Sequence, residues 1–303
     1  MVIKALILGL LVVCCLADES PLKKIVEEIR IITKDFTDEL KKRVTWVVQD
    51  FEDNVFKGWT NEEFRQSLGD RVASSADGYS VEPESNYKQD APATLDWSTN
   101  NCTHAIRDQG KCASCWAFSA ASIVSDRCCL KGSDHGWLSP QELVSCDKTS
   151  QGCQGGQRIE ALQYIEKKGL VHESCAPYTG KDGHCPGYCV DGKDWGDSHV
   201  CKCTNARNCM GEKGIISCLS TGPVGVGMKI YEDILYYKSG VYKWDGKSKF
   251  QGLHAIKLVG YGPGYWKCAN TWGASWGMDG YFMIGRDECE LTKTGAVTCD
   301  VVP

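Results

Sequence analysis

Apolar residues recur every three or four positions between residues 22 and 47, with charged residues between them. This spacing predicts an amphipathic helix, because residues three and four apart lie on one face of a helix. A second, shorter helix is predicted in GWTNEEF, where Thr60 can cap the helix and Glu63 stands three residues later. Residues 69–90 are polar and offer little that a core could use. They predict an exposed linker of the kind that proteases cleave.

From residue 91 onward the pattern is first helical and then strand-like. A buried helix is predicted from about Cys115 to Leu130, and two more over SPQELVSC, with Ser139 as N-cap, and GGQRIEALQYIEKKG. Residues 175–218 are rich in glycine and cysteine and predict loops. From about residue 220, β-branched and aromatic runs separated by glycine predict strands. Helices followed by strands favour an α+β fold with a helical half and a sheet half.

The charge of the chain is unevenly distributed. Residues 18–90 carry 17 acidic and 11 basic side chains, whereas residues 91–303 carry 22 of each. Aliphatic, aromatic and cysteine residues make up 42% of the 303 positions, which is enough to bury a core. The net charge of −5 argues against a nucleic-acid-binding protein, because such proteins carry a basic patch or stripe.

The first 17 residues have the features of a cleaved secretory signal. Lys4 precedes an apolar run, Ala5 to Val13, which is too short to span a bilayer, and Ala17 ends a cleavage-site pattern. No later stretch is long and apolar enough to span a membrane. We therefore expect a soluble product that enters the secretory pathway. The alternative is that the segment is retained as a membrane anchor.

The cysteine count follows from this expectation. Two of the nineteen cysteines, Cys14 and Cys15, would leave with the signal, so seventeen remain. An oxidising compartment favours disulfides, and an odd number leaves one cysteine without an intramolecular partner. The spacings of a later group also allow a zinc cluster, although the secretory context favours disulfides for them. That group is Cys185, Cys189, Cys201 and Cys203.

Cys115 is the candidate for a reactive thiol. It begins the predicted buried helix, and the positive end of a helix stabilises a thiolate. Such a nucleophile needs a base and a group that orients the base. His254 begins an apolar strand and Asn270 lies on the next one, so antiparallel pairing can bring the two together. Taken singly, each of these residues is more often structural.

The segment QGKCASCWAF resembles the active-site segment of papain-like cysteine proteases. The resemblance continues in order through LVSCD, GCQGG, HAIKLVGYG, YWKCANTWGASWG and GYF, and it covers nearly all of residues 91–303. IRDQG, SDRCC, KGLVHESCAPY, YEDILYYKSGVY and RDEC resemble the cathepsin B-like branch. The family fold would have a helical left lobe and a β-sheet or barrel right lobe, preceded by a short helical propeptide.

The resemblance implies a catalytic role for four residues. Cys115 would be the nucleophile, and His254 the base that later protonates the leaving amine. Asn270 would orient the imidazole. The side-chain amide of Gln109, with the backbone N–H of Cys115, would form the oxyanion hole.

The resemblance also implies the substrate contacts and two disulfides. Gly155 and Gly156 would pair with an extended substrate as an added strand. Trp272 would shield the contact between the asparagine and the histidine, and Thr294 would lie at the base of the S2 pocket. The implied disulfides join Cys112 to Cys153 and Cys102 to Cys129. The pairing of the cysteines from 175 to 218 stays open, and Cys128, Cys218 or Cys268 could be free.

Four positions depart from the family pattern. Ala113 stands where the family has glycine, and Leu253 replaces a glycine before the histidine, where its side chain could point into the cleft. The segment CAPYTGKDGHCPGYC has a single histidine, His184, in place of the paired histidines of the cathepsin B occluding loop. This predicts endopeptidase rather than peptidyl-dipeptidase activity. Thr294 replaces an acid, which predicts apolar P2 residues in preference to Arg.

The sequence therefore predicts a cysteine endopeptidase made as an inhibited zymogen. Residues 1–17 would be the signal peptide, 18–90 the propeptide and 91–303 the peptidase domain. We expect no cofactor or metal, polypeptide substrates, the propeptide as inhibitor, and a monomer without nucleic acid or membrane anchor. The compartment would be an acidic, lysosome-like vesicle or the exterior, and acid would weaken propeptide contacts by protonating carboxylates.

Three alternatives remain open at this stage. The first is a catalytically silent papain-like binding protein. The second is a disulfide-rich structural or adhesive protein. The third is an enzyme with transpeptidase or exopeptidase activity.

Overall fold

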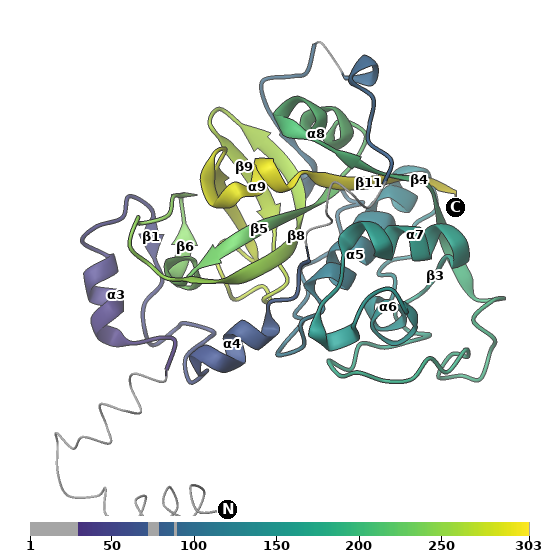
Figure 1. The fold of residues 1–303 in the computed structure, drawn as a ribbon, viewed down its shortest axis with the longest axis horizontal. Helices are drawn as coiled ribbons and strands as arrows, with labels where there is room; N and C mark the ends of the chain where they lie inside the picture. Colours follow the sequence, from purple (N-terminus) through teal and green to yellow (C-terminus); the bar gives the residue numbers. More distant parts are fainter. Residues whose placement is uncertain (1–29, 72–78, 88–89, 303) are drawn as a thin grey trace, which may run out of the picture.

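The computed structural model describes residues 30–71, 79–87 and 90–302. The predicted signal peptide and the first part of the predicted first helix lie outside the described residues. Figure 1 shows a sheet-rich lobe beside a helical lobe. The early helix α3 (Lys34–Leu40) lies at the outer side of the sheet-rich lobe, and α4 (Asn61–Ser67) lies between α3 and the helical lobe. The predicted α+β arrangement in two lobes is confirmed.

The helical lobe contains the three helices that the sequence predicts. The helix α5 (Cys115–Leu130) is buried over most of its length and packs against the other two. The side chain of Ser139 accepts a hydrogen bond from the backbone N–H of Glu142, so it caps the next helix as expected. The other helices of this lobe are α6 (Pro140–Cys146) and α7 (Arg158–Lys168).

One sheet connects the two lobes. Its strand order is β3-β4-β11-β5-β8-β9-β10-β7, with β2 paired to β8, and it runs as an open path rather than a closed barrel in the described residues. The pairing of β7 with β10 is parallel and the other pairs are antiparallel. The strands are β2 (Leu95–Asp96), β3 (Leu170–Val171), β4 (His199–Cys209), β5 (Val224–Tyr231), β7 (Val241–Tyr242), β8 (Phe250–Gly262), β9 (Tyr265–Ala269), β10 (Tyr281–Gly285) and β11 (Ala296–Val302).

Two predictions of local structure are wrong in part. The first helix ends at Leu40, and the chain then turns into β1 (Val47–Val48), which pairs with β6 (Tyr237–Ser239). Pairing with a distant strand overrides the helical spacing of residues 41–47. Residues 175–218 are not all loop, because they contain β4 and most of α8 (Gly211–Leu219).

The remaining elements are short. The helix α4 has the predicted capping box between Thr60 and Glu63. The others are α9 (Leu291–Thr294) and the 3₁₀ turns η2 (Glu84–Asn86), η3 (Trp97–Thr99), η4 (Gly152–Gln154), η5 (Glu232–Tyr236) and η6 (Glu288–Glu290).

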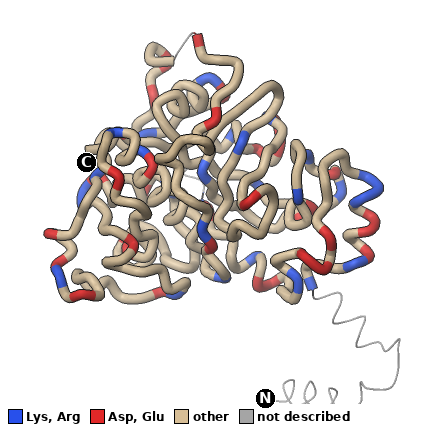
Figure 2. The backbone as a smooth tube through the Cα atoms, turned by 180° about the vertical axis from the view of Figure 1, so that it is seen from behind, with Lys and Arg blue, Asp and Glu red and all other residues tan. Residues whose placement is uncertain are grey.

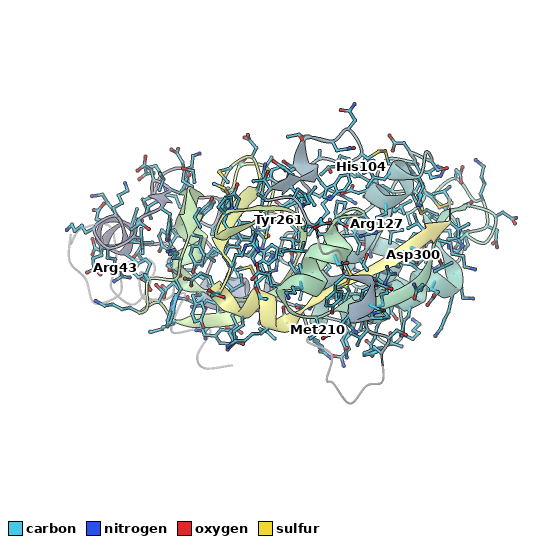
Figure 3. All side chains as sticks on the ribbon, turned by 90° about the horizontal axis from the view of Figure 1, so that it is seen from above. Arg43, His104, Arg127, Met210, Tyr261 and Asp300 are labelled. Atoms are coloured by element: carbon cyan, nitrogen blue, oxygen red, sulfur yellow. A yellow bond between two sulfur atoms is a disulfide. The ribbon has the colours of Figure 1, made fainter. Side chains whose placement is uncertain are left out.

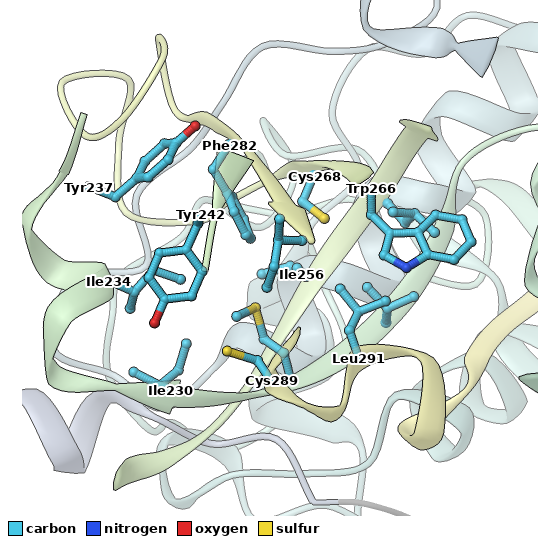
Figure 4. Close-up of a cluster of buried hydrophobic side chains, with 14 of the residues drawn as sticks. Ile230, Ile234, Tyr237, Tyr242, Ile256, Trp266, Cys268, Phe282, Cys289 and Leu291 are labelled. Atoms are coloured by element: carbon cyan, nitrogen blue, oxygen red, sulfur yellow. The ribbon is translucent and has the colours of Figure 1, made fainter. Parts of the chain in front are cut away.

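The described residues before position 91, which we call the early segment, share the hydrophobic core of the sheet lobe. Trp46 packs against Tyr237 and Tyr242, and Phe36 packs against Tyr236. Figure 4 shows the interior of this core, in which Tyr237 and Tyr242 lie near Phe282 and Ile234. The early segment is therefore built into the fold as described, rather than tethered beside it.

Seven disulfides are present among the described residues, including the two that the resemblance implies. Of the seventeen cysteines in the described ranges, Cys115, Cys268 and Cys289 are unpaired and buried, so three rather than one lack a partner. Cys268 and Cys289 lie in the core of the sheet lobe (Figure 4). The zinc-like group is fully used in disulfides. The pairs are 102–129, 112–153, 128–201, 146–185, 175–189, 203–299 and 209–218.

Acidic and basic residues are interspersed over the molecule, as Figure 2 shows for one side. Arg43 of the early segment and Asp300 of β11 lie toward opposite ends (Figure 3). No helix in the described ranges is long and apolar enough to cross a membrane.

Candidate active site

His254 and Asn270 meet because their strands pair. His254 lies in β8 and Asn270 directly follows β9, and these strands are antiparallel neighbours. The histidine Nε2 lies 2.8 Å from the asparagine Oδ1, which also accepts from the backbone N–H of Thr271. Nε2–H therefore donates to Asn270, which leaves Nδ1 as the free ring nitrogen. This Nδ1 is buried and has no hydrogen-bond partner among the residues that the structure describes.

The indole of Trp272 covers this pair. It stacks on the ring of His254, with centroids 4.7 Å apart and planes at 23°. On its other contacts, Trp272 meets Phe56 and Phe64 of the early segment edge-on, at 5.2 and 5.6 Å. The indole thus lies between the ring of His254 and the early segment.

Cys115 is the first residue of α5, and its side chain is fully buried. Backbone groups of Ala255, Gly69 and Trp116 lie near enough to its sulfur to favour the thiolate and so act to lower its pKa. Ala255 directly follows His254 in β8, so the sulfur lies next to the strand that carries the histidine. The start of the helix and the strand thereby bring the predicted nucleophile and base to one place.

Burial opposes charge on both the cysteine and the histidine in this structure. Burial, with a smaller effect from the Asp70 carboxylate, raises the pKa of Cys115 to about 12. Burial lowers the pKa of His254 to about 4, although the hydrogen bond to Asn270 acts in the opposite direction. The sequence predicts a lowered thiol pKa. The opposite is found here because the early segment covers the sulfur and excludes water.

Gln109 is fully buried, and its amide is fixed at both ends. Its Nε2 donates to the carbonyl oxygens of Cys112 and Ser67, each at 2.8 Å. Its Oε1 accepts from the hydroxyl of Thr271 at 2.6 Å. Ser67 is the last residue of α4, so a carbonyl of the early segment occupies the predicted oxyanion donor.

The early segment then passes along the predicted substrate-binding glycines. The N–H of Gly156 donates to the carbonyl of Gly69, and the N–H of Arg71 donates to the carbonyl of Gly156, both at 2.9 Å. Asp70 therefore lies opposite Gly156 in a parallel bridge. Gly155 adjoins the same stretch, because an added Cβ there would lie 2.8 Å from the Gly69 carbonyl oxygen.

Gly69 explains how Ala113 is accommodated. A Cβ on residue 69 would overlap the carbonyl oxygen of Ala113 and lie 2.7 Å from its methyl group. The extra methyl at Ala113 is thus matched by a glycine in the segment that covers it. Gly69 and Asp70 are buried, so the prediction of an exposed linker is wrong for the start of residues 69–90.

Asp70 and Arg158 form a buried ion pair between the early segment and α7. The Arg158 Nε lies 3.0 Å from the Asp70 Oδ1, and both side chains are almost inaccessible. The backbone N–H of Asp70 also donates to the carbonyl of Leu253 at 3.3 Å. Thr294 lies nearby, since its hydroxyl donates to the carbonyl of Gly227, which faces Asp70.

The loop from 175 to 189 is tied down by disulfides at both ends, 175–189 and 146–185. The hydroxyl of Tyr178 donates to the carbonyl of Gln109 at 2.8 Å and contacts the hydroxyl of Ser114 at 2.7 Å. His184 is exposed. The loop thereby braces the turn before Cys115 from the outside.

Four contributors to this site have no sequence signal that we recognised. Ser67 acts through its carbonyl, which any residue has, and Asp70 is one acid among many in its segment. Thr271 directly follows the predicted Asn270, and Arg158 lies two positions after the predicted Gly156. This closeness in sequence is the one available hint. Within the described ranges, no group of three or more His, Cys, Asp or Glu side chains could hold a metal ion.

Comparison with known proteins identifies the family of the chain. Residues 91–299 match the family model described as papain family cysteine protease. The chain is 36% identical to "Cathepsin B-like CP3" of Giardia intestinalis, over 78% of this chain and 84% of that protein. It is 35% identical to "Procathepsin L" of Rattus norvegicus, over 77% and 72%. These two identities do not separate the B-like and L-like branches.

A solved structure extends the likeness to the early segment. The fold is similar to "proCathepsin B S9 from Trypanosoma congolense", with a TM-score of 0.79 and 28% identity. The match covers 90% of this chain and 100% of that one, so it includes residues before position 91. The cysteines therefore belong to a papain-like fold, which argues against the disulfide-rich structural or adhesive protein. The chain belongs to the papain family of cysteine proteases.

Proposed function

We propose that this chain is a cysteine endopeptidase made as an inhibited zymogen. Residues 18–90 are the propeptide and residues 91–303 the peptidase domain, after a signal peptide at 1–17. The observation that carries the proposal is the hydrogen bond from His254 to Asn270, which leaves Nδ1 free beside the strand residue that contacts the Cys115 sulfur.

The mechanism is a two-step acyl transfer. Once the cleft is open, the Cys115 proton moves to His254 Nδ1, and the thiolate attacks the peptide carbonyl carbon. Gln109 Nε2 and the Cys115 backbone N–H stabilise the negative oxygen of the tetrahedral intermediate. The intermediate collapses, the amine leaves with the proton from His254, and a thioester remains. Water, deprotonated by the same histidine, then hydrolyses the thioester.

The propeptide inhibits by occupying each part of this machinery. The Ser67 carbonyl accepts the hydrogen bond that Gln109 would give to the oxyanion. Residues 69–71 take the backbone groups of Gly156 that a substrate would use. Covering the cleft also keeps the thiol and imidazole neutral, and a neutral thiol is a poor nucleophile.

Acid would release the propeptide through some carboxylates and not through others. Hydrogen bonding to Lys111 lowers the pKa of Glu63, so this contact stabilises docking above the free pKa of a glutamate and is lost as pH falls. Burial raises the pKa of Asp70, although Arg158 acts in the opposite direction. A raised pKa means that protonation does not favour release there, so Glu63 contributes to an acid switch and Asp70 does not.

Endopeptidase activity rests on the loop from 175 to 189. Its single histidine is exposed and takes no part in the bracing contacts, so no histidine pair is present there to hold a substrate's terminal carboxylate. An acid switch also suits an enzyme that enters the secretory pathway and matures in an acidic, lysosome-like vesicle or after secretion.

The proposal is tested by labelling the thiol with a peptidyl epoxide. Purified zymogen is held at pH 4 to 5 until it is processed, then labelled and located by mass spectrometry. We expect covalent label on Cys115, hydrolysis of internal peptide bonds, and neither in Cys115→Ala. A processed chain that takes no label would instead be the silent binding protein. Product analysis with an added amine distinguishes hydrolysis from transpeptidation.

A further inference from the structure

Arg158 is a buried cation in the cleft that the mechanism above does not use. It is the first residue of α7, and 4% of its surface is exposed. Its Nη1 donates to the carbonyl oxygens of Gly225 at 3.1 Å and Gly295 at 3.4 Å. These two carbonyls fix the guanidinium, while its Nε lies toward the cleft and meets the Asp70 carboxylate.

The absence of a side chain at Gly227 makes room for the Asp70 carboxylate beside Arg158. A Cβ on Gly227 would overlap the Asp70 Oδ2 and lie 2.7 Å from the Arg158 Nη2, so the missing side chain makes the space that the acid fills. Thr294, at the same wall, is uncharged and donates to the Gly227 carbonyl at 2.6 Å. Among the ion pairs of the described residues, Asp70 is the partner of Arg158.

A substrate side chain would enter the same pocket. Asp70 lies opposite Gly156, and the residue opposite a given position of a strand projects on the same side whether the pairing is parallel or antiparallel. The substrate residue that pairs with Gly156 therefore takes the place of Asp70. By the family resemblance this residue is P2, and Thr294 at the wall is the position assigned to the S2 pocket.

Loss of the propeptide removes the carboxylate that pairs with Arg158. A guanidinium that is buried without an anion is costly, and a charge-assisted hydrogen bond to a carboxylate is stronger than one to a neutral acceptor. An acidic side chain restores the pair, a neutral one leaves the guanidinium without an anion, and a basic one is repelled. Burying the acid still costs free energy, which is why the pKa of Asp70 is raised in spite of Arg158. The sequence interpretation considered Thr294 alone and expected apolar P2 residues.

We propose that Arg158 is a specificity-determining residue that makes the enzyme prefer substrates with Asp or Glu at P2. The preference rests on the proposed peptidase function. The propeptide uses the same recognition through Asp70, so it occupies this pocket as a substrate-like acid.

The test uses acid-activated enzyme and peptides that differ at P2 alone, with Asp, Glu, Asn, Gln, Leu or Arg. The concentration of active enzyme is measured by titrating Cys115 with the epoxide. We expect kcat/KM for each acid to exceed that for its amide by about tenfold or more. Because acid and amide have nearly the same shape, this ratio reports charge recognition and not general activity.

Two variants assign the preference to its residue. In Arg158→Gln the acid-to-amide ratio should fall to about one. Since Arg158 also holds two carbonyls, this variant can fail to fold. Thr294→Glu keeps the arginine and places a carboxylate beside it, and it should remove the preference in the same way.

The outcomes separate the two proposals. If Cys115 is labelled but amides or Leu are cleaved as well as the acids, acid recognition is wrong and the peptidase function stands. An acid preference that persists in every variant that folds and reacts with the epoxide would also overturn the role of Arg158. If Cys115 takes no label and no peptide is cleaved, the proposed function fails, and acid selectivity fails with it.

Discussion

Phe64 anchors α4 over the proposed catalytic residues, and Phe64→Ala should release the proposed inhibition of the zymogen at neutral pH. The ring is fully buried and packs edge-on against Trp272 and against Phe56. Three residues later on the same helix, the carbonyl of Ser67 accepts from Gln109. Loss of the ring therefore loosens the helix that blocks the oxyanion donor.

The magnitude follows from the burial of the ring. Replacing a buried Phe by Ala costs about 3–5 kcal/mol, because apolar contacts are lost and a cavity remains. The contact with Trp272 exists in the docked state alone, so most of this cost falls on docking. Since about 1.4 kcal/mol is a tenfold change in an equilibrium constant, 3–4 kcal/mol corresponds to an open fraction that is about 10²–10³ times larger.

The assay is the rate at which a peptidyl epoxide labels Cys115 in the intact zymogen at pH 7, read by mass. Only the open form reacts, so the rate should rise by about the same factor as the open fraction. Gln66→Ala is the matched control, because Gln66 is exposed on the same helix and its hydrogen bond is to Glu62 within that helix. A folded Phe64→Ala zymogen that labels within about threefold of the control would refute this account of docking, given the cost expected for a buried ring.

Three further predictions follow from single contacts. Thr271→Val removes the hydroxyl that orients Gln109, so kcat should fall about tenfold with KM nearly constant in steady-state assays; an unchanged kcat would exclude this positioning role. Glu63→Gln should weaken the acceleration of processing as pH falls from about 5 to 4, followed on gels, and an unaltered pH profile would count against the depressed pKa of Glu63 as part of the switch. Replacing Cys112 and Cys153 together by Ser should lower the free energy of unfolding by about 4 kcal/mol in denaturant titrations, because the disulfide closes a long loop; a loss below about 1 kcal/mol would contradict this.

The sequence alone determined the elements whose signals are local. The capping residues Thr60 and Ser139 marked the starts of α4 and α6, where a side chain bonds a backbone N–H three residues away. The motif around Cys115 placed the nucleophile at the start of α5, and the strand patterns placed His254 beside Asn270. Each of these features is written within a few consecutive residues or in a strongly patterned pair of strands.

The tertiary structure decided the features that depend on distant partners. The first helix ends at Leu40 because the chain beyond it finds β6, and β4 forms within a cysteine-rich stretch because β11 and β3 lie beside it. The state of the catalytic pair also depends on what covers it. The same thiol that a helix start would activate has a raised pKa when the early segment removes it from water.

The pairing of Asp70 with Arg158 shows this limit most clearly. The two residues are 88 positions apart, and each looks like an ordinary surface charge in its own segment. The effect of a charged side chain on stability and binding depends on its burial and on the ion that it pairs with, and neither is encoded by the neighbouring sequence. The sequence thus determined which family of chemistry the chain resembles, whereas the folded arrangement decided which groups the early segment covers and which buried charges meet there.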